Sequence, residues 1–209
     1  MSLTNLSVNE FVDSLSSKSA VPGGGGASAL VGSLGIALGN MVANLTLGKD
    51  KYALVQADMK ELNRQAIILQ NDLLELVQKD ADLFEPLSKA YTLPEDTEEE
   101  KEYKEKVMEE ALVNAAITPL EIMEKCGEAI CLQEEFAKKG SVLAVSDAGV
   151  GAELCLSALK GAYLNVLINT KMMKNREYAT NLNEKADALL VKYSKVANEI
   201  YEYVKNQLQ

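Results

Sequence analysis

The chain has 209 residues and a formal net charge of −10, and it contains neither His nor Trp. This length predicts one domain, residues 1–209, with enough chain for a large core. The negative charge argues against sequence-independent nucleic-acid binding, which needs a basic face to displace counterions, so no nucleic acid is expected as a partner. Because His is absent, any general acid or base must be Asp, Glu, Lys, Tyr or Cys.

The composition, rich in Ala, Leu, Glu and Lys with only 4 Pro residues, is typical of helical proteins. No strand-like alternation of useful length and no internal repeat is evident in the sequence. We therefore predict an all-α fold: a single-domain bundle of long, partly kinked helices around two central helices that are rich in small residues.

The first expected helix covers residues 7–16, because Ser7 and Glu10 have the spacing of a capping box. A run of four glycines, Gly23–Gly26, then opens a segment without charge that continues to Gly48. A helix is expected to begin near Gly26 or Ala27. Further small residues lie on one of its faces, where another helix can pack at close range: Ser28, Gly32, Gly35 and Gly39.

The glycine run supports two interpretations. It forms a tight turn before a closely packed helix, or its free backbone N–H groups and the partly positive helix end bind an anion. The uncharged stretch is also long enough for a membrane span. Gly, Ser and Asn dilute its apolar part, however, so a buried central helix is the better interpretation and no membrane association is expected.

Four more helices follow in the sequence. The first is expected over about 52–93, with a kink or break at Pro86, and the second over 97–139, with a Thr97–Glu100 capping box and a bend at Pro119. The third is expected to run from Ser146 or Asp147, one of which is the N-cap, to about Met172. The last is expected over 179–206.

The three cysteines lie in apolar helical surroundings, which suggests buried thiols, a reducing compartment and hence a cytoplasmic location. No basic region leads into an apolar core at the N-terminus, so no signal peptide is expected. Neither His nor Cys-x-x-Cys spacing is present, so no metal site is expected.

Several polar residues are candidates for a site. Asp147 lies at the start of a helix whose one face also carries Asn165 and Asn169, two amides that need hydrogen-bonding partners if they are buried. Asp80 lies on an otherwise apolar face, and Lys49 follows the end of the uncharged helix, where a cation is favourable. Taken singly, Asp147, Asp80 and Lys49 each have an ordinary structural explanation as a cap or a charge in a favourable place, whereas the two asparagines are harder to explain in this way.

Together these residues resemble the cyclodeaminase/cyclohydrolase family over essentially the whole chain. The matching segments are Pro22-Gly23-Gly24-Gly25, Leu45-Thr46-x-Gly48-Lys49, Asp80 four residues before Phe84, Ala90-Tyr91-x-Leu93-Pro94, Pro119-Leu120, Ser146-Asp147, and Asn165-Val166-x-Ile168-Asn169. The chain departs from the family pattern where Gly26-Ala27 precede Ser28, since the family usually has Ser soon after the third glycine.

The resemblance implies an all-helical homodimer, or a larger assembly of dimers, that handles the one-carbon unit on N5 and N10 of tetrahydrofolate without a metal or other cofactor. It implies formiminotetrahydrofolate cyclodeaminase, which forms 5,10-methenyltetrahydrofolate and ammonia. The alternative is methenyltetrahydrofolate cyclohydrolase, which gives 10-formyltetrahydrofolate, and the competing non-enzyme class is a helical scaffold.

From the residues and the resemblance together we predict the roles in the site. Asp147 is the carboxylate nearest the reacting carbon, and Asp80 is the second acid/base candidate. Asn165 and Asn169 orient the pterin or the carboxylate. Backbone donors of Gly23, Gly24 and Gly25, together with Lys49, hold the folate and its anionic glutamate tail.

Overall fold

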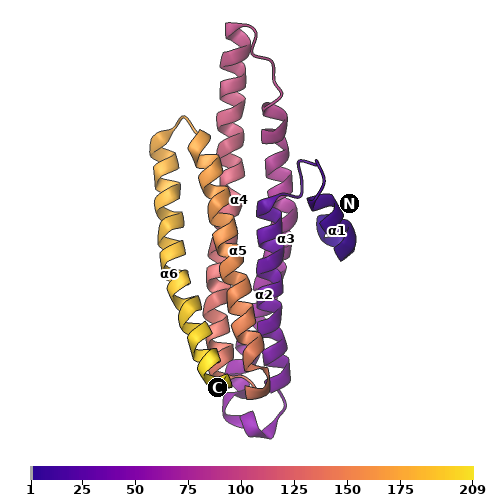
Figure 1. The fold of residues 1–209 in the computed structure, drawn as a ribbon, viewed down its shortest axis with the longest axis vertical. Coiled ribbons are helices and arrows are strands. Elements are labelled where there is room, and N and C mark those ends of the chain that lie inside the picture. Colours follow the sequence, from indigo (N-terminus) through magenta and orange to yellow (C-terminus); the bar gives the residue numbers. More distant parts are fainter. Residues whose placement is uncertain (1) are drawn as a thin grey trace.

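A computed structural model describes residues 2–209 as a bundle of long helices (Figure 1). These residues contain no strand, so the predicted all-α class is confirmed. The six α-helices are α1 Val8–Leu15, α2 Gly24–Thr46, α3 Gln56–Ala90, α4 Glu98–Lys139, α5 Val145–Met172 and α6 Arg176–Leu208. Short 3₁₀ turns cover Leu3–Asn5, Asp50–Val55 and Val142–Ala144.

Helices α2 and α5 run antiparallel, side by side, along the middle of the bundle (Figure 1). α2 packs on α3 and α4, α5 packs on α4, and α6 closes one side against α4 and α5. The first part of α4 projects beyond the other helices at the top of Figure 1. A separate small apolar cluster, which includes Leu87, Leu112 and Leu182, lies apart from the main core.

The small residues of α2 and α5 make this close packing possible. A Cβ placed at Gly35 would lie 2.5 Å from Sγ of Cys155, and one at Gly39 would lie 2.6 Å from the Phe136 ring. Across the same contact, a Cβ at Gly151 would lie 2.8 Å from the carbonyl oxygen of Gly35. The prediction that two helices with small-residue faces form the centre is therefore confirmed.

Length and composition would allow α2, and the segment Val142–Met172, to cross a membrane. Within the bundle, 61% and 56% of their most apolar windows are buried. Central helices of water-soluble bundles have the same length and composition.

Both predicted capping boxes are present: Ser7 with Glu10 at α1, and Thr97 with Glu100 at α4. The start expected for α2 is wrong by two to three residues. The amide of Ala27 donates to the carbonyl of Gly23, so the first helical turn lies within the glycine run itself and α2 begins at Gly24.

The N-cap predicted for α5, Ser146 or Asp147, is wrong. The N-cap is Ala144, and no side chain caps this helix. The 3₁₀ turn of Val142–Ala144 leads directly into α5, which leaves Asp147 in the first helical turn. There its carboxylate still lies near the positive end of the helix.

Pro86 and Pro119 lie inside α3 and α4, and both helices continue past them. Each proline removes one N–H donor and so leaves the carbonyl four residues earlier without its helical partner. For Pro119 that carbonyl belongs to Ala115, which lines the candidate site described below.

The glycine contacts predict the effect of adding one methyl group. Gly35→Ala should destabilise the protein by about 1–3 kcal/mol, because the new Cβ overlaps Cys155 and the backbone of Gly151. Gly26→Ala in the same helix is the matched control, since its nearest contact would be an ordinary 3.4 Å. Urea denaturation of both variants tests this, and equal stabilities would contradict close packing as the reason for the glycine at residue 35.

Candidate active site

A cleft of about 110 Å³ lies where four helices meet near the start of α2. α2 contributes its glycine-rich first turn, and α3, α4 and α5 contribute one wall each. The lining residues are Ala20, Val21, Gly23, Gly24, Gly25, Asp80, Phe84, Ala115, Pro119, Asn165, Ile168 and Asn169. Six of the eight residues predicted for the site therefore lie around one cavity.

Asp80 lies directly against the first turn of α2. A Cβ at Gly25 would be 2.2 Å from Oδ1 of Asp80, so only glycine leaves room for the carboxylate there. A backbone hydrogen bond from Gly26 also reaches the carboxylate. The partly positive helix end thus receives a carboxylate from α3 in the position where an anion is favourable.

The environment of Asp80 shifts its proton affinity. Burial raises the pKa of Asp80 from 3.8 to about 6, and the hydrogen bond from Gly26 opposes this rise. Desolvation is the larger effect because the surrounding side chains of the cleft are uncharged. At neutral pH such a group is poised to accept a proton and to return it.

The two asparagines of α5 lie on the opposite wall. Nδ2 of Asn169 donates to the carbonyl of Ala115 at 2.9 Å, which is the carbonyl that Pro119 leaves without a helical donor. Nδ2 of Asn165 donates to its own helix at Gly161, also at 2.9 Å. Both amides are thereby held in place, and their predicted role in orienting a ligand stays a prediction.

Because Gly24 has no side chain, the Asn165 side chain fits against the start of α2. A Cβ at Gly24 would be 3.2 Å from Nδ2 of Asn165, a tight contact. Ser28, at the departure from the family pattern, donates its hydroxyl to the carbonyl of Gly24 at 2.7 Å. A Cβ added at Gly161 would lie only 2.4 Å from this hydroxyl, so the Ser28 side chain fills the space between α2 and α5 at that point.

Lys49 and Asp147 do not lie in this cleft. Asp147 is in the first turn of α5, and 18 residues of helix, about 27 Å, separate it from Asn165. Lys49 follows α2 at its far end, about 35 Å from Gly24 along the helix. Asp80, and not Asp147, is the carboxylate that lines the cleft with the two asparagines. The predicted role of Asp147 as the carboxylate nearest the reacting carbon stays a prediction.

Sequence reasoning missed the carbonyl of Ala115 and the side chain of Ile168 as parts of the cleft wall. Pro119 was a usable signal for the first, because a proline inside a helix frees the carbonyl four residues before it. Ile168 lies between the two asparagines and is 55% exposed, which only the packing of α5 reveals.

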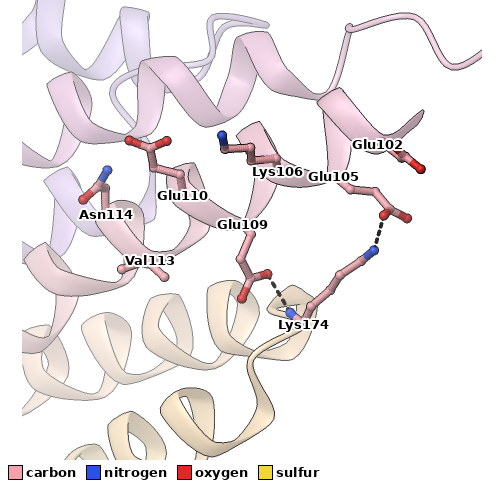
Figure 2. A pocket seen from close by; sticks show the side chains of 8 residues that line it. All are labelled: Glu102, Glu105, Lys106, Glu109, Glu110, Val113, Asn114 and Lys174. Atoms are coloured by element: carbon pink, nitrogen blue, oxygen red, sulfur yellow. Dashed lines mark hydrogen bonds and ion pairs between the residues drawn. The ribbon is translucent and has the colours of Figure 1, made fainter. Parts of the chain in front are cut away.

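A larger cavity, about 660 Å³, lies between the first part of α4 and the turn before α6 (Figure 2). Lys174 pairs there with Glu105, and Glu109 accepts hydrogen bonds from the backbone amides of Lys174 and Asn175 at 2.6 and 2.8 Å. Two more glutamates line it, Glu102 and Glu110. This excess of carboxylates disfavours an anionic ligand, so the smaller cleft is the better candidate site.

Within residues 2–209, no group of three or more His, Cys, Asp or Glu side chains is arranged to hold a metal ion. The chemistry that the cleft itself offers is proton transfer at Asp80, together with hydrogen bonding by backbone and amide groups.

Comparison with known proteins identifies the family. A sequence model described as formiminotransferase-cyclodeaminase matches residues 7–188. The chain belongs to this family. The match includes every residue named around the cleft.

Two relatives and one solved structure place the chain within the family. The methenyltetrahydrofolate cyclohydrolase of Methylorubrum extorquens is 37% identical over 98% of both chains. The mouse formimidoyltransferase-cyclodeaminase is 32% identical over 90% of this chain, which spans only 35% of that longer protein. The crystal structure of formiminotetrahydrofolate cyclodeaminase from Thermotoga maritima has a TM-score of 0.81 and 29% identity, covering 98% of this chain and 96% of that one.

The raised pKa of Asp80 predicts how stability depends on pH. Between about pH 4 and 6 the folded protein binds this proton more tightly than the unfolded chain, so stability falls as the pH rises through this window. Asp80→Asn should therefore raise the free energy of unfolding at pH 8 by about 1–3 kcal/mol, and by much less at pH 4.

Urea denaturation at the two pH values measures this difference. Asp82→Asn is the matched control, because the Asp82 side chain is exposed two residues further along the same helix. A loss of stability at pH 8 in Asp80→Asn would show that the charged carboxylate stabilises the fold.

Proposed function

We propose that this chain is a folate one-carbon enzyme and that its cleft binds the amidinium carbon between N5 and N10 of tetrahydrofolate. The observation that carries the proposal is Asp80, a carboxylate with a pKa of about 6 in a cleft of otherwise uncharged side chains. A carboxylate in this position stabilises a cationic amidinium, and it exchanges a proton with water or nitrogen near neutral pH.

In the cyclohydrolase reaction, ionised Asp80 takes a proton from water as the oxygen adds to the methenyl carbon. Asp80 then returns this proton to N5 as the bond between carbon and N5 breaks. The formyl group stays on N10, and the hydroxyl proton of the intermediate passes to solvent. The relative named methenyltetrahydrofolate cyclohydrolase, 37% identical over nearly the whole of both chains, supports this reaction as the first candidate.

In the cyclodeaminase reaction, N10 adds to the formimino carbon while the N10 proton passes to the imino nitrogen, and protonated Asp80 supplies the further proton with which ammonia leaves. The mouse relative and the Thermotoga maritima structure support this second candidate. The two reactions pass through the same kind of tetrahedral carbon between two nitrogens, so one carboxylate serves either. They differ in the protonation state in which Asp80 begins.

The other walls of the cleft have supporting roles in this proposal. The backbone of Gly23–Gly25 and the amides of Asn165 and Asn169 hold the pterin ring next to Asp80. No step requires a metal or redox cofactor.

We also propose a cytoplasmic location, which is supported by the three free cysteines in the described chain, and a homodimer or larger assembly.

The reaction is tested by offering purified protein 5,10-methenyltetrahydrofolate and, separately, 5-formiminotetrahydrofolate, and by following the absorbance of the methenyl ring. If Asp80 is the base of hydrolysis, kcat/KM should rise with pH through an apparent pKa near 6. If Asp80 is the acid of deamination, kcat/KM should fall through the same pKa. A folded protein that turns over neither compound would refute the proposed function.

The role of Asp80 is tested by substitution. Asp80→Asn should lower kcat by at least about 10²-fold, because the proton transfer is lost. Asp82→Asn should keep wild-type turnover. Gly25→Ala should also lower kcat, since the new Cβ displaces the Asp80 carboxylate, whereas Gly26→Ala introduces only ordinary contacts. Normal turnover in Asp80→Asn would remove Asp80 from the mechanism.

A further inference from the structure

The two asparagine side chains of the cleft present their oxygens, and not their nitrogens, to a ligand. Nδ2 of Asn165 donates to the carbonyl of Gly161 at 2.9 Å. Nδ2 of Asn169 donates to the carbonyl of Ala115, also at 2.9 Å. Because a backbone carbonyl can only accept a hydrogen bond, the orientation of both amides is fixed. Both residues line the cleft, so the acceptors that α5 offers there are the two Oδ1 oxygens.

These oxygens have no donor of their own. Among residues 2–209, no N–H or O–H group donates a hydrogen bond to Oδ1 of Asn165 or of Asn169. Asn169 is only 7% exposed, so its oxygen has little access to bulk water. A buried acceptor that lacks a donor is unfavourable, and a ligand that brings N–H groups into the cleft relieves this.

The remaining walls of the cleft divide donors and acceptors between them. Asp80 on α3 adds a carboxylate, which accepts hydrogen bonds when it is ionised. The first turn of α2 supplies the donors, because the N–H groups of Gly24 and Gly25 have no partner within the helix. Phe84 and Ile168 add apolar surface that suits the faces of a ring. The cleft therefore fits a cyclic ligand with an acceptor toward α2 and N–H donors toward α5.

The glycine contacts order these groups along the bundle. A Cβ at Gly24 would lie 3.2 Å from Nδ2 of Asn165, and a Cβ at the next residue, Gly25, would overlap the carboxylate on α3. Asp80 and Asn165 therefore lie at nearly the same level. Asn169 is one helical turn further along α5, a spacing that separates Cβ atoms by roughly 5–6 Å. A ligand held by all three side chains lies between Asp80 and Asn165 and extends from there toward Asn169.

A reduced pterin has its N–H groups in this arrangement. N5, which carries the one-carbon unit, and N8, which carries a hydrogen, are on opposite sides of one ring. The 2-amino group is on the same edge as N8, with C8a, N1 and C2 between the two nitrogens. With N5 beside Asp80, N8–H faces Asn165 and the 2-amino group faces Asn169. The carbonyl oxygen at C4, next to N5, is then the acceptor for the glycine N–H groups.

We propose that Oδ1 of Asn165 accepts the N8–H group of the pterin and Oδ1 of Asn169 its 2-amino group, so that Asn165 selects reduced over oxidised folates. In folic acid, N8 has a lone pair and no hydrogen, and this lone pair would face the Asn165 oxygen. A site that is built to accept an N–H group rejects a ligand that lacks it. The choice of a pterin rests on the proposed function, whereas the orientation of the amides rests on hydrogen bonds that are independent of it.

Binding of 7,8-dihydrofolate and of folic acid tests this selection without any turnover. Both ligands carry the 2-amino group and the same tail, but only dihydrofolate has a hydrogen on N8. The wild-type protein, titrated by calorimetry with oxygen excluded, should bind dihydrofolate about tenfold or more tightly than folic acid. Equal affinities for the two ligands would overturn the proposal.

Two substitutions separate the roles of the asparagines. Asn165→Ala should reduce the preference for dihydrofolate to about threefold or less, because the acceptor for N8–H is lost. Asn169→Ala should weaken the binding of both ligands by a similar factor and keep the preference, because both carry the 2-amino group. Asn114→Ala is the matched control: it makes the same chemical change at an exposed residue of α4 that lines the larger cavity, and it should change neither affinity.

Each variant is compared with itself across two ligands, so a general loss of stability cancels in the ratio of affinities. A preference that survives in Asn165→Ala would contradict the proposal, as would one that disappears in Asn169→Ala. Asn169→Ala leaves the Ala115 carbonyl without its donor. If this variant does not fold, the ratio measured for Asn165→Ala still decides whether N8–H is selected.

The outcomes also distinguish this proposal from the proposed function. If the wild-type protein binds no tetrahydrofolate and turns none of its derivatives over, the proposed function fails, and the assignment of the two oxygens to a pterin fails with it. If turnover is normal and dihydrofolate and folic acid bind equally, only the selection by Asn165 fails. Binding of dihydrofolate that requires potassium or ammonium ions would assign the oxygens to a cation and refute their role toward the pterin.

Discussion

The close approach of α2 to its neighbours is the constraint on which the rest of the structure depends. At Gly35 and Gly39 a single Cβ would overlap a neighbouring side chain, so these helices meet at distances that only glycine permits. The cost is conformational, because ordering glycines in a helix is entropically unfavourable. Extensive burial compensates for it: Ile36, Val42 and Ala43 on the same helix are fully buried.

The same constraint determines the chemistry of the cleft. Because α2 begins with glycines, the carboxylate of Asp80 reaches the helix end and lies against its backbone. The cleft walls exclude enough water to raise the pKa of Asp80 to about 6, and the hydrogen bond from Gly26 limits the rise. A lower pKa would suit stability and leave a weaker base, so this position favours reactivity over stability.

Local patterns were sufficient for most of the fold. Capping boxes at Ser7 and Thr97 depend on residues three positions apart, and both were predictable. The start of α5 was not predictable in this way, because a 3₁₀ turn stands in place of the side-chain cap that Asp147 would supply. In the site, residues that share a helical face are not thereby close together. Asp147 and Asn165 do lie on similar faces, but a 28-residue helix separates its ends by more than a substrate's length.

An uncharged helix can bring backbone amides close to a ligand, yet it cannot supply a cation within its own span. The first cation after the glycine run is Lys49, one full helix length from the cleft. Bending the chain back would require breaking α2, which its packing forbids. A cation that meets a ligand at this cleft must therefore come from another element of the fold or from another molecule.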